Sequence, residues 1–378
     1  MVLQKKVTQL SNSNQILIIA GEVSGDLFGA HLAKEMKQIA NVSISAVGGD
    51  KLKQISNTFI SHIAGKHVVG ISSFLQRFSF MPKLKRQLMT HCLTNRPKVA
   101  IIIDFQHHHT AIAQLLQTMG IPIITYITPN YWVWKDVKKA QKIARYSQSI
   151  VCIFKPEYEF YKQFSSSVYY FGHPFMQLCT PKNKPKIRSQ IAFFPGSRTQ
   201  EFYRYTPLFL KAIQQVQQTR AFKPVFSLPH SQYKEDLTRL LSDYNLDETC
   251  IWKQDAAQLM SQSEGALMSS GSLTLEALLT RTPMAIIAIL KPISYFFIKY
   301  IFRLKVPFIG LPNILANQEI VPELVQHDVT VQSLTHIINQ LLDHKLSTEN
   351  YKLALNQING DAPIKHVAQH IINKCQSL

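Results

Sequence analysis

EGALMSSGSLTLEALLTRTP, residues 264–283, contains a short apolar run, then the small residues SSGS at 269–272, then a helical pattern. This order predicts a buried strand, a tight turn and the start of a helix. Backbone N–H groups at a helix start are unpaired, so a phosphate or diphosphate is favoured there. Glu276, one turn into the helix, is placed to accept hydrogen bonds from a ribose diol. The alternative is an ordinary helix start, with Ser270 and Ser272 as caps and Glu276 completing a capping box.

The composition indicates a basic, globular, intracellular protein. The 378 residues are 46% hydrophobic, which is enough for two domains with separate cores. Lys and Arg number 41 against 23 Asp and Glu, a net charge of +18. Such an excess predicts attraction to nucleic acid, an anionic membrane surface or phosphorylated substrates. The five cysteines are scattered without a C-x-x-C pair, which argues against a disulfide framework and a zinc site and favours a reducing cytoplasm.

The chain shows no segment that is typical of secretion or of membrane crossing. Residues 1–15 are polar and lack the apolar core of a signal peptide. Residues 284–311 are hydrophobic, but lysine, arginine and proline interrupt them before the ~20 apolar residues of a membrane span are reached. We therefore expect a cytoplasmic protein.

Short apolar runs alternate with helical spacers along the chain, which predicts an α/β protein with parallel sheets. We expect two Rossmann-like, doubly wound domains, at 14–179 and 187–360, joined by a proline- and lysine-rich linker. The C-terminal helix, at about 362–376, is expected to pack back on the first domain. The runs that predict strands are 16–20, 99–103, 122–127, 150–154, 168–171, 191–194, 224–228, 266–268 and 284–289.

Ligands of such folds bind at the carboxyl ends of the strands. The first strand ends in a turn with Gly21, Glu22, Ser24 and Asp26. Gly21 permits a tight turn, Glu22 is aimed at a ligand, and Asp26 is expected to complement the dipole of the next helix. The turn is not G-x-G-x-x-G, which disfavours a nicotinamide-dependent dehydrogenase.

Asp104 ends the strand predicted at 99–103 and is followed by Gln106, His107, His108 and His109. A lone carboxylate buried at a strand end has a raised pKa and can take a proton from a substrate hydroxyl. The histidines raise the alternative of a metal site. Only two of them would share a face, with no further ligand nearby, so we predict no metal.

Other strand ends carry aromatic and cationic residues. Trp132 lies in an aromatic group, Tyr131 to Trp134, that suits either sugar and acyl-chain packing or an interdomain core. His173 is expected to face a cleft between the domains, where it binds a phosphate or caps the hinge. In the second half, Arg198 follows a strand and a sharp turn and offers a bidentate fork to phosphate oxygens. Two turns of the second domain thus predict the same diphosphate.

Together these segments resemble the lipid-A-disaccharide synthases, a glycosyltransferase family with the GT-B architecture, in which two Rossmann-like domains face a cleft. The matching segments are AGEVSGD at 20–26, YITPNYWVW at 126–134, GHP at 172–174, PGSR at 195–198, SGSLTLEALL at 270–279 and LPNILANQEIVPELV at 311–325.

The resemblance implies an inverting transfer of 2,3-diacylglucosamine from UDP to the 6-hydroxyl of 2,3-diacylglucosamine 1-phosphate, with neither metal nor cofactor. The catalytic candidates are Asp104 as the base, Glu22 and His107. The residues assigned to the cleft are Gly21, Ser24, Trp132 and His173. The residues assigned to the UDP donor are Arg198, Ser270, Gly271, Ser272, Glu276, Asn313 and Glu319.

The sequence departs from the family pattern in three places. The family's I-D-x-P-D-F-N becomes a segment with Gln106, His107 and His109, so a second carboxylate is missing. Gly-Arg-Glu becomes Asn317-Gln318-Glu319, which loses a cation, and the acid after GHP becomes Gln177.

Two other functions stay open. One is another UDP-sugar enzyme of the same fold, such as an epimerase or a different lipid glycosyltransferase. The other is a basic nucleic-acid-binding protein, which lacks an RRM, KH or basic-helix signature here. The expected partners are therefore the two lipid substrates and an anionic inner-membrane surface, without nucleic acid, and a homodimer stays open.

Residues 68–88 predict how the protein reaches lipid substrates. Ile71, Phe74, Leu75 and Phe78 recur at helical spacing and are followed by a collar of cations. This pattern is typical of a helix that lies in the membrane interface, and the alternative is an ordinary helix facing the core. A second candidate surface is 293–305. We expect peripheral association with the inner membrane.

Overall fold

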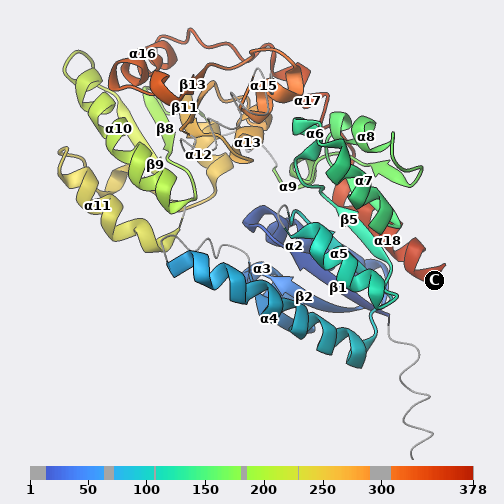
Figure 1. Cartoon of the computed structure of the whole chain (residues 1–378). Coiled ribbons are helices and arrows are strands. Elements are labelled where there is room, and N and C mark those ends of the chain that lie inside the picture. Colours follow the sequence, from blue (N-terminus) through green and yellow to red (C-terminus); the bar gives the residue numbers. More distant parts are fainter. Residues whose placement is uncertain are drawn as a thin grey trace, which may run out of the picture. The chain divides into compact units, whose positions relative to one another are not determined.

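The computed structural model describes residues 14–63, 72–105, 108–179, 185–228, 230–289 and 308–377, with the backbone alone for 72–79. The chain forms two compact units (Figure 1). Unit 1 comprises the chain up to Gln177 and again from Ile358, and unit 2 comprises Leu178–Gln357. Unit 1 is therefore built from both ends of the sequence.

Unit 1 is organised around a seven-stranded sheet of order β3-β2-β1-β4-β5-β6-β7, in which all neighbours are parallel. The chain runs outward from β1 in one direction and from β4 in the other, so the topological switch point lies between β1 and β4. The strands are β1 (Gln15–Ala20), β2 (Ser43–Gly48), β3 (Thr58–His62), β4 (Val99–Ile103), β5 (Ile123–Tyr126), β6 (Ser149–Cys152) and β7 (Val168–Tyr170).

Helices connect these strands because each apolar stripe can be buried against the sheet. The central strands β1, β4 and β5 are buried along their whole length, as expected for a sheet covered on both faces. The helices are α2 (Val23–Ile39), α3 (Asp50–Ile55), α4 (Ser72–Asn95), α5 (His109–Thr118), α6 (Tyr131–Trp134), α7 (Val137–Tyr146), α8 (Lys155–Tyr161), α9 (Phe175–Leu178) and α18 (Pro363–Gln376).

Unit 2 repeats the plan with a six-stranded parallel sheet of order β10-β9-β8-β11-β12-β13, whose switch point lies between β8 and β11. The strands are β8 (Gln190–Phe194), β9 (Lys223–Ser227), β10 (Ile251–Trp252), β11 (Gly265–Ser269), β12 (Met284–Ala288) and β13 (Glu323–Val325). The helices are α10 (Thr199–Gln217), α11 (Lys234–Ser242), α12 (Ala256–Gln262), α13 (Leu273–Leu279), α15 (Leu311–Ala316), α16 (Val331–Leu342) and α17 (Tyr351–Leu355).

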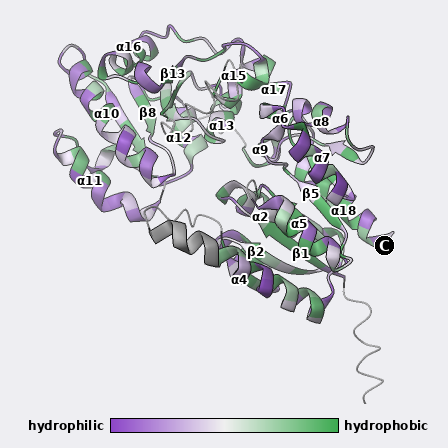
Figure 2. Ribbon diagram, viewed as in Figure 1, coloured by the Kyte–Doolittle hydropathy of each residue, from purple (hydrophilic) through white to green (hydrophobic). Residues whose placement is uncertain are grey.

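Two doubly wound parallel sheets confirm the predicted fold class. The sequence did not predict β2, β3, β10 and β13, which are short, polar or at a sheet edge. In β2 the fully buried Ser45 interrupts the apolar pattern, and it is tolerated because Gln15 Nε2 donates to its hydroxyl at 2.6 Å. Figure 2 shows the strands of unit 1 in hydrophobic green, whereas much of α7 and α11 is hydrophilic purple.

The C-terminal half of α4 packs into the core of unit 1. Leu84 and Leu88 are buried there, and Phe80 and Met81 pack against the same cluster, so this half of the helix faces the core. Ile71 and the second candidate surface, 293–305, lie outside the described residues. For Phe74, Leu75 and Phe78 only the helical backbone is described. Among the described residues, no helix is both long and apolar enough to span a bilayer.

Two glycines allow the chain to re-enter unit 1. Gly172 has a φ of +103°, and a Cβ on it would lie 2.7 Å from the Cα of Gly360. A Cβ on Gly360 would lie 2.0 Å from the carbonyl oxygen of Phe171. The two backbones therefore cross at a distance that admits no side chain on either strand. Beside the crossing, the backbone N–H of His173 donates to the carbonyl of Ile358 at 2.9 Å.

Candidate active site

The switch point of unit 1 joins the turn after β1 to the end of β4. A Cβ on Gly21 would lie 2.3 Å from the Phe105 ring and 2.8 Å from the Asp104 carbonyl, so this approach requires glycine. Ser24 then donates from its hydroxyl to Asp104 Oδ2 at 3.2 Å. Two residues that the sequence singled out in separate motifs thus lie together at the edge where ligands bind in this fold.

Asp104 has an unusual backbone conformation. Its φ is +43°, and its N–H donates to the carbonyl of Ile127, which itself has a φ of +64°. Left-handed geometry costs an aspartate little, but for a β-branched isoleucine it is a genuine outlier. Such strain persists only where surrounding bonds hold it, and it concentrates at functional sites. The hydrogen bond from Asp104 to Ile127 therefore holds the backbone that carries the half-buried Asp104 side chain.

Glu22 and Asp26, in the turn after β1, have different surroundings. Glu22 is half-buried at the N-cap of α2, and its side chain does not cap the helix. Asp26 is buried and accepts hydrogen bonds from the backbone N–H groups of Gly49, Lys51 and Leu52 at 2.6–3.1 Å. Asp26 thus caps the start of α3, a structural role that spacing alone did not indicate.

The histidines after Asp104 do not form one cluster. His107 lies outside the described residues. His109 is fully buried, its Nε2 lies 2.9 Å from Thr125 Oγ1, and burial lowers its pKa to about 3. A neutral core histidine of this kind is not available to bind a ligand. Among the described residues, no group of three His, Cys, Asp or Glu side chains is arranged to hold a metal ion.

Two residues that were assigned to the cleft, Trp132 and His173, are buried. Trp132 is buried and packs on Phe154, with ring centroids 5.4 Å apart. His173 is buried among the rings of Phe28, Phe154 and Phe175, and burial lowers its pKa to about 3. His173 Nδ1 accepts a hydrogen bond from the Phe175 N–H at 3.1 Å, so it caps α9 instead of facing a ligand.

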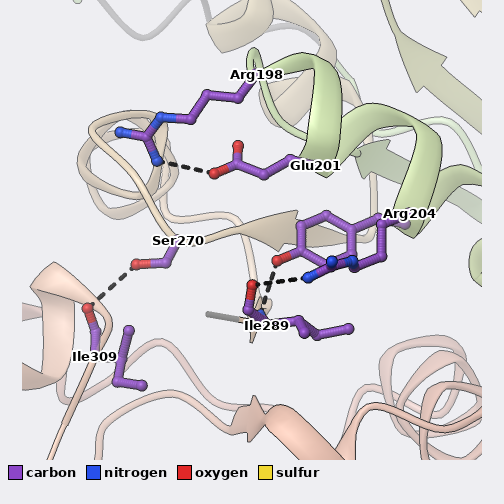
Figure 3. Close-up of polar contacts among 7 residues, drawn as sticks. Arg198, Glu201, Arg204, Ser270, Ile289 and Ile309 are labelled. Carbon is purple, nitrogen blue, oxygen red and sulfur yellow. Dashed lines mark hydrogen bonds and ion pairs between the residues drawn. The ribbon is translucent and has the colours of Figure 1, made fainter. Parts of the chain in front are cut away.

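In unit 2, the turn after β8 presents Arg198. Gly196 has a φ of +95°, and a Cβ there would lie 2.4 Å from Glu201 Oε2 and 2.8 Å from Ser269 Oγ. The turn after β8 therefore packs directly against the end of β11. Arg198 donates to Glu201 at 2.9 Å, yet its side chain is 64% exposed, so most of its N–H donors remain available (Figure 3).

The turn after β11 contains the small residues SSGS at 269–272. Ser270 donates from its hydroxyl to the carbonyl of Ile309 at 3.2 Å (Figure 3), and Gly271 and Ser272 are exposed. A Cβ on Gly271 would meet nothing within 4 Å. Ser272 stands at the N-cap of α13 without a side-chain bond, so the capping-box alternative is wrong.

Glu276, on α13, is the most distinctive group of unit 2. Burial, and secondarily the charge of Asp255, raises its pKa to about 7. Its carboxylate forms no hydrogen bond or ion pair with another described residue. Burying an acid without a partner costs stability, and in a strand-end site such a group is a candidate for ligand binding.

Asn313 on α15 and Glu319 in the segment after it have different surroundings. Asn313 is fully buried; its Nδ2 donates to the Val321 carbonyl and to Glu323 Oε1, and its Oδ1 accepts from the N–H groups of Ile320 and Val321. All its hydrogen-bonding capacity is used, so Asn313 positions the loop instead of touching the donor. Glu319 is exposed on that loop.

The departure at Asn317 is explained by its backbone. This residue ends α15 with a φ of +53°, the left-handed conformation for which glycine is best and asparagine next best. The substitution of the family's glycine therefore preserves the turn. The lost cation at Gln318 has no structural compensation among the described residues.

Two structural acids were not predicted from the sequence, the half-buried Glu323 and the buried Glu157. Glu323 on β13 accepts from the N–H groups of Ile309 and Gly310 at 2.8–2.9 Å and so supports the segment that Ser270 contacts. Glu157 on α8 accepts four hydrogen bonds in unit 1. The sequence did contain a signal for Glu157: it directly follows a proline and stands at the third position of a helix that begins soon after a strand.

Two doubly wound units with polar turns at both switch points define an enzyme of the GT-B type, and solved structures of this kind share the fold. The chain matches MnaA of S. aureus in complex with UDP at a TM-score of 0.65, with 12% identity and coverage of 96% of this chain and 97% of that one. It matches a spinosyn rhamnosyltransferase at a TM-score of 0.61, with 10% identity and coverage of 95% and 100%.

Within that class, the chain belongs to the lipid-A-disaccharide synthase family: the family model described as lipid-A-disaccharide synthetase matches residues 16–372. Lipid-A-disaccharide synthase 2 of Legionella pneumophila is 30% identical over 91% of this chain and 92% of its own length. Lipid-A-disaccharide synthase of Anaeromyxobacter dehalogenans is 28% identical over 95% of this chain and 97% of its own length.

Proposed function

We propose that the protein transfers 2,3-diacylglucosamine from UDP to the 6-hydroxyl of 2,3-diacylglucosamine 1-phosphate, giving lipid A disaccharide 1-phosphate and UDP. Membership of the family across both units supports this reaction. The bond from the anomeric carbon to the diphosphate oxygen breaks, and a bond from that carbon to the acceptor oxygen forms with inversion. The observation that carries the proposal is the hydrogen bond from Ser24 to the strand-end carboxylate of Asp104.

In this proposal Asp104 is the general base. It takes the proton of the acceptor hydroxyl as that oxygen attacks, and Ser24 keeps one carboxylate oxygen oriented. The backbone of Asp104 is fixed by its bond to Ile127, which limits the entropy lost on reaching the reactive geometry. Glu22 lies at the same turn and is the second candidate, and His107 is the third.

The donor side of the proposed reaction lies in unit 2. Arg198 offsets the charge of the diphosphate, which grows on the leaving oxygen in the transition state. Ser270, Gly271 and Ser272 approach the same group, and Glu276 accepts hydrogen bonds from the ribose diol. The two diol hydroxyls then supply the hydrogen-bond donors that the half-buried Glu276 carboxylate lacks among the described residues. Asn313 holds the loop that carries Glu319.

The proposed substrates carry acyl chains, so the enzyme must meet an anionic bilayer surface. Unit 1 presents a suitable surface, which we call the α6–α7 surface. Trp134 is 36% exposed and Val137 is 43% exposed, which places apolar side chains where they can enter a headgroup layer. The exposed cations beside them are Lys135, Lys138, Lys139, Lys142 and Arg145.

The charges of the α6–α7 surface favour an anionic partner. The acid between the two helices, Asp136, is already paired with Lys139 at 3.0 Å. Each cation near an anionic membrane contributes about 1 kcal/mol of attraction. The buried face of α7, with Ala140 and Ile143, keeps the cations on the opposite side. The proposed location is therefore the inner-membrane surface, with peripheral attachment.

The direct test incubates the protein with UDP-2,3-diacylglucosamine and 2,3-diacylglucosamine 1-phosphate, followed by mass analysis. A disaccharide 1-phosphate and an equal amount of UDP are expected. A second incubation contains UDP-N-acetylglucosamine alone, because related folds include epimerases. An isomerised sugar nucleotide in that sample, without disaccharide in the first, would replace the proposed function with an epimerase.

A further inference from the structure

Glu157 is a buried carboxylate whose hydrogen-bonding capacity is completely used. It lies in the first turn of α8, is 1% exposed, and follows the carboxyl end of β6. Oε1 accepts from the backbone N–H of Thr128 at 3.0 Å and from its hydroxyl at 2.6 Å. Oε2 accepts from the N–H groups of Ile153 and Phe154 at 2.8 and 3.2 Å. One side chain therefore binds the turns after two neighbouring strands, β5 and β6.

No cation compensates this acid. Among the described residues Glu157 has no ion pair, and the titratable groups that face it are Tyr126 of β5, Cys152 of β6, Tyr161 of α8 and Tyr170 of β7. Burial raises the pKa of each of these groups, so all are neutral near pH 7. A buried carboxylate without a counter-charge is costly for the fold, and its four accepted hydrogen bonds offset that cost.

The hydrogen bonds of Glu157 lead directly to Asp104. Glu157 binds both polar groups of Thr128, and the preceding residue is Ile127, with its left-handed backbone. The Ile127 carbonyl accepts from the Asp104 N–H at 3.1 Å, and its own N–H donates to the Val151 carbonyl at 3.1 Å. The strained turn that positions Asp104 is thus held from one side by β6 and from the other by Glu157.

We infer that Glu157 is a positioning residue for the reaction: by binding Thr128 it keeps Ile127 in its left-handed conformation and so aims the Asp104 carboxylate at the acceptor hydroxyl. The inference rests on the proposed role of Asp104. It assigns Glu157 no contact with substrate.

The ionised form of Glu157 is required, because a protonated carboxyl must give up one of its four accepted bonds. Burial raises the pKa of Glu157 to about 7, while the bonds from Thr128, Ile153 and Phe154 act in the opposite direction. Protonation therefore increases as the pH falls through about 7. Turnover should decline over the same interval as the turn loosens.

The test compares Glu157→Gln with Glu159→Gln. Glu159 lies on the same helix, but its side chain is 65% exposed and, among the residues that the structure describes, forms an ion pair with Lys162 alone. The amide of Glu157→Gln places a donor opposite the N–H groups of Ile153 and Phe154, so two accepted bonds are lost. We expect kcat to fall on the order of 10-fold or more, with UDP affinity unchanged because that site lies in unit 2. The acid limb of turnover near pH 7 should disappear in this variant and persist in Glu159→Gln.

A double-mutant cycle shows whether Glu157 acts through Asp104. If it does, Glu157→Gln added to Asp104→Asn costs little beyond Asp104→Asn alone. If the kcat losses of the two single variants multiply in the double variant, the inference is wrong. It is also wrong if Glu157→Gln keeps the wild-type kcat. An active Asp104→Asn would instead refute the proposed role of Asp104. Should Glu157→Gln fail to fold, Thr128→Val removes only the hydroxyl bond and should lower kcat about 3-fold or more; no loss there would also overturn the inference.

Discussion

Ser24 Oγ lies 3.2 Å from Asp104 Oδ2, although 80 positions separate the two residues in the sequence. The bond exists because β1 and β4 pair in register, with Ala20 opposite Ile103, and because glycine at position 21 lets the turn approach Phe105. The N-terminal motif and the strand-end acid are thus parts of one site. Substitutions at these two residues should therefore lower turnover without lowering UDP affinity.

Asp104→Asn should retain UDP binding and lose turnover on the order of 100-fold or more, since an amide cannot accept the proton of the acceptor hydroxyl. Isothermal titration with UDP and the disaccharide assay measure the two properties. Ser24→Ala, which removes only the orienting bond, should cause a smaller loss. Near-normal turnover of Asp104→Asn would transfer the role of base to Glu22 or His107.

Arg198→Ala should weaken UDP binding much more than acceptor binding, because a bidentate, charged contact to phosphate is lost. The matched control is Arg204→Ala on α10, the helix that Arg198 precedes; within the described part of the chain its guanidinium donates a hydrogen bond only to the Ile289 carbonyl, at 3.4 Å (Figure 3). Equilibrium titration with each ligand gives the comparison. Equal losses for UDP and acceptor would make Arg198 a structural residue.

Glu276→Gln should weaken donor binding at pH 8 by about 10-fold, because two hydrogen bonds from the diol to a carboxylate are weakened. In the unchanged protein the affinity should decline as the pH falls through about 7, the raised pKa of Glu276. The donor's diphosphate has no group that titrates near neutrality, so the pH dependence reports the protein. A pH-independent affinity would exclude Glu276 from the diol site.

The same residue predicts a stability change of definite sign. Burial favours the protonated form of Glu276 in the fold, so the fold loses stability relative to the unfolded chain as the pH rises from 4.5, the ordinary pKa, to about 7. Glu276→Gln should therefore raise Tm at pH 8 by roughly 2 °C or more and have little effect at pH 4. Thermal unfolding at the two pH values checks the sign.

Vesicle binding should depend on the α6–α7 surface. Trp134→Ala combined with Lys138→Glu and Lys142→Glu should abolish cosedimentation with anionic phosphatidylglycerol vesicles and leave UDP binding intact. The control is Lys211→Glu with Lys234→Glu, two exposed cations of unit 2 whose reversal changes the net charge equally. Equal losses in both proteins would show that overall charge, and not this surface, attracts the bilayer.

The segment at 68–88 supplies an independent comparison. Phe74→Glu with Phe78→Glu should also release the protein from anionic vesicles while the fold persists, if these side chains face the membrane. Unfolding of this variant, seen by circular dichroism, would place both phenylalanines in the core with Leu84 and Leu88.

Strands and turns could be predicted from the sequence where their own residues determine them. Fully buried strands such as β1 and β4 gave apolar runs, and glycines at 21 and 196 marked turns that the backbone requires. The pairing of β1 with β4 and of β8 with β11 came from chain topology, which no run of residues encodes. The placement of the candidate residues after these four strands was predictable because parallel strands align their carboxyl ends.

The incorrect assignments concern residues whose partners are distant in sequence. His173 and Trp132 were assigned to the cleft, but the rings of Phe28, Phe154 and Phe175 surround His173, and Trp132 packs on Phe154. Asn313 was assigned to the donor, but the loop at 320–323 uses all its bonds. A polar residue after a strand can serve either a ligand or a neighbouring loop, and only the tertiary contacts distinguish the two.

Unit 1 is completed by the last helix of the chain, and this has a consequence for synthesis. Ile364, Val367, Ala368 and Ile371 of α18 are buried, and α18 packs on α2, near the start of the sequence. A ribosome delivers α2 first and α18 last, after all of unit 2. Because domains fold as units during translation, unit 2 can finish folding on the ribosome, while the face of α2 that receives α18 stays uncovered until release. Nascent unit 1 therefore exposes this face of α2 until α18 has been synthesised.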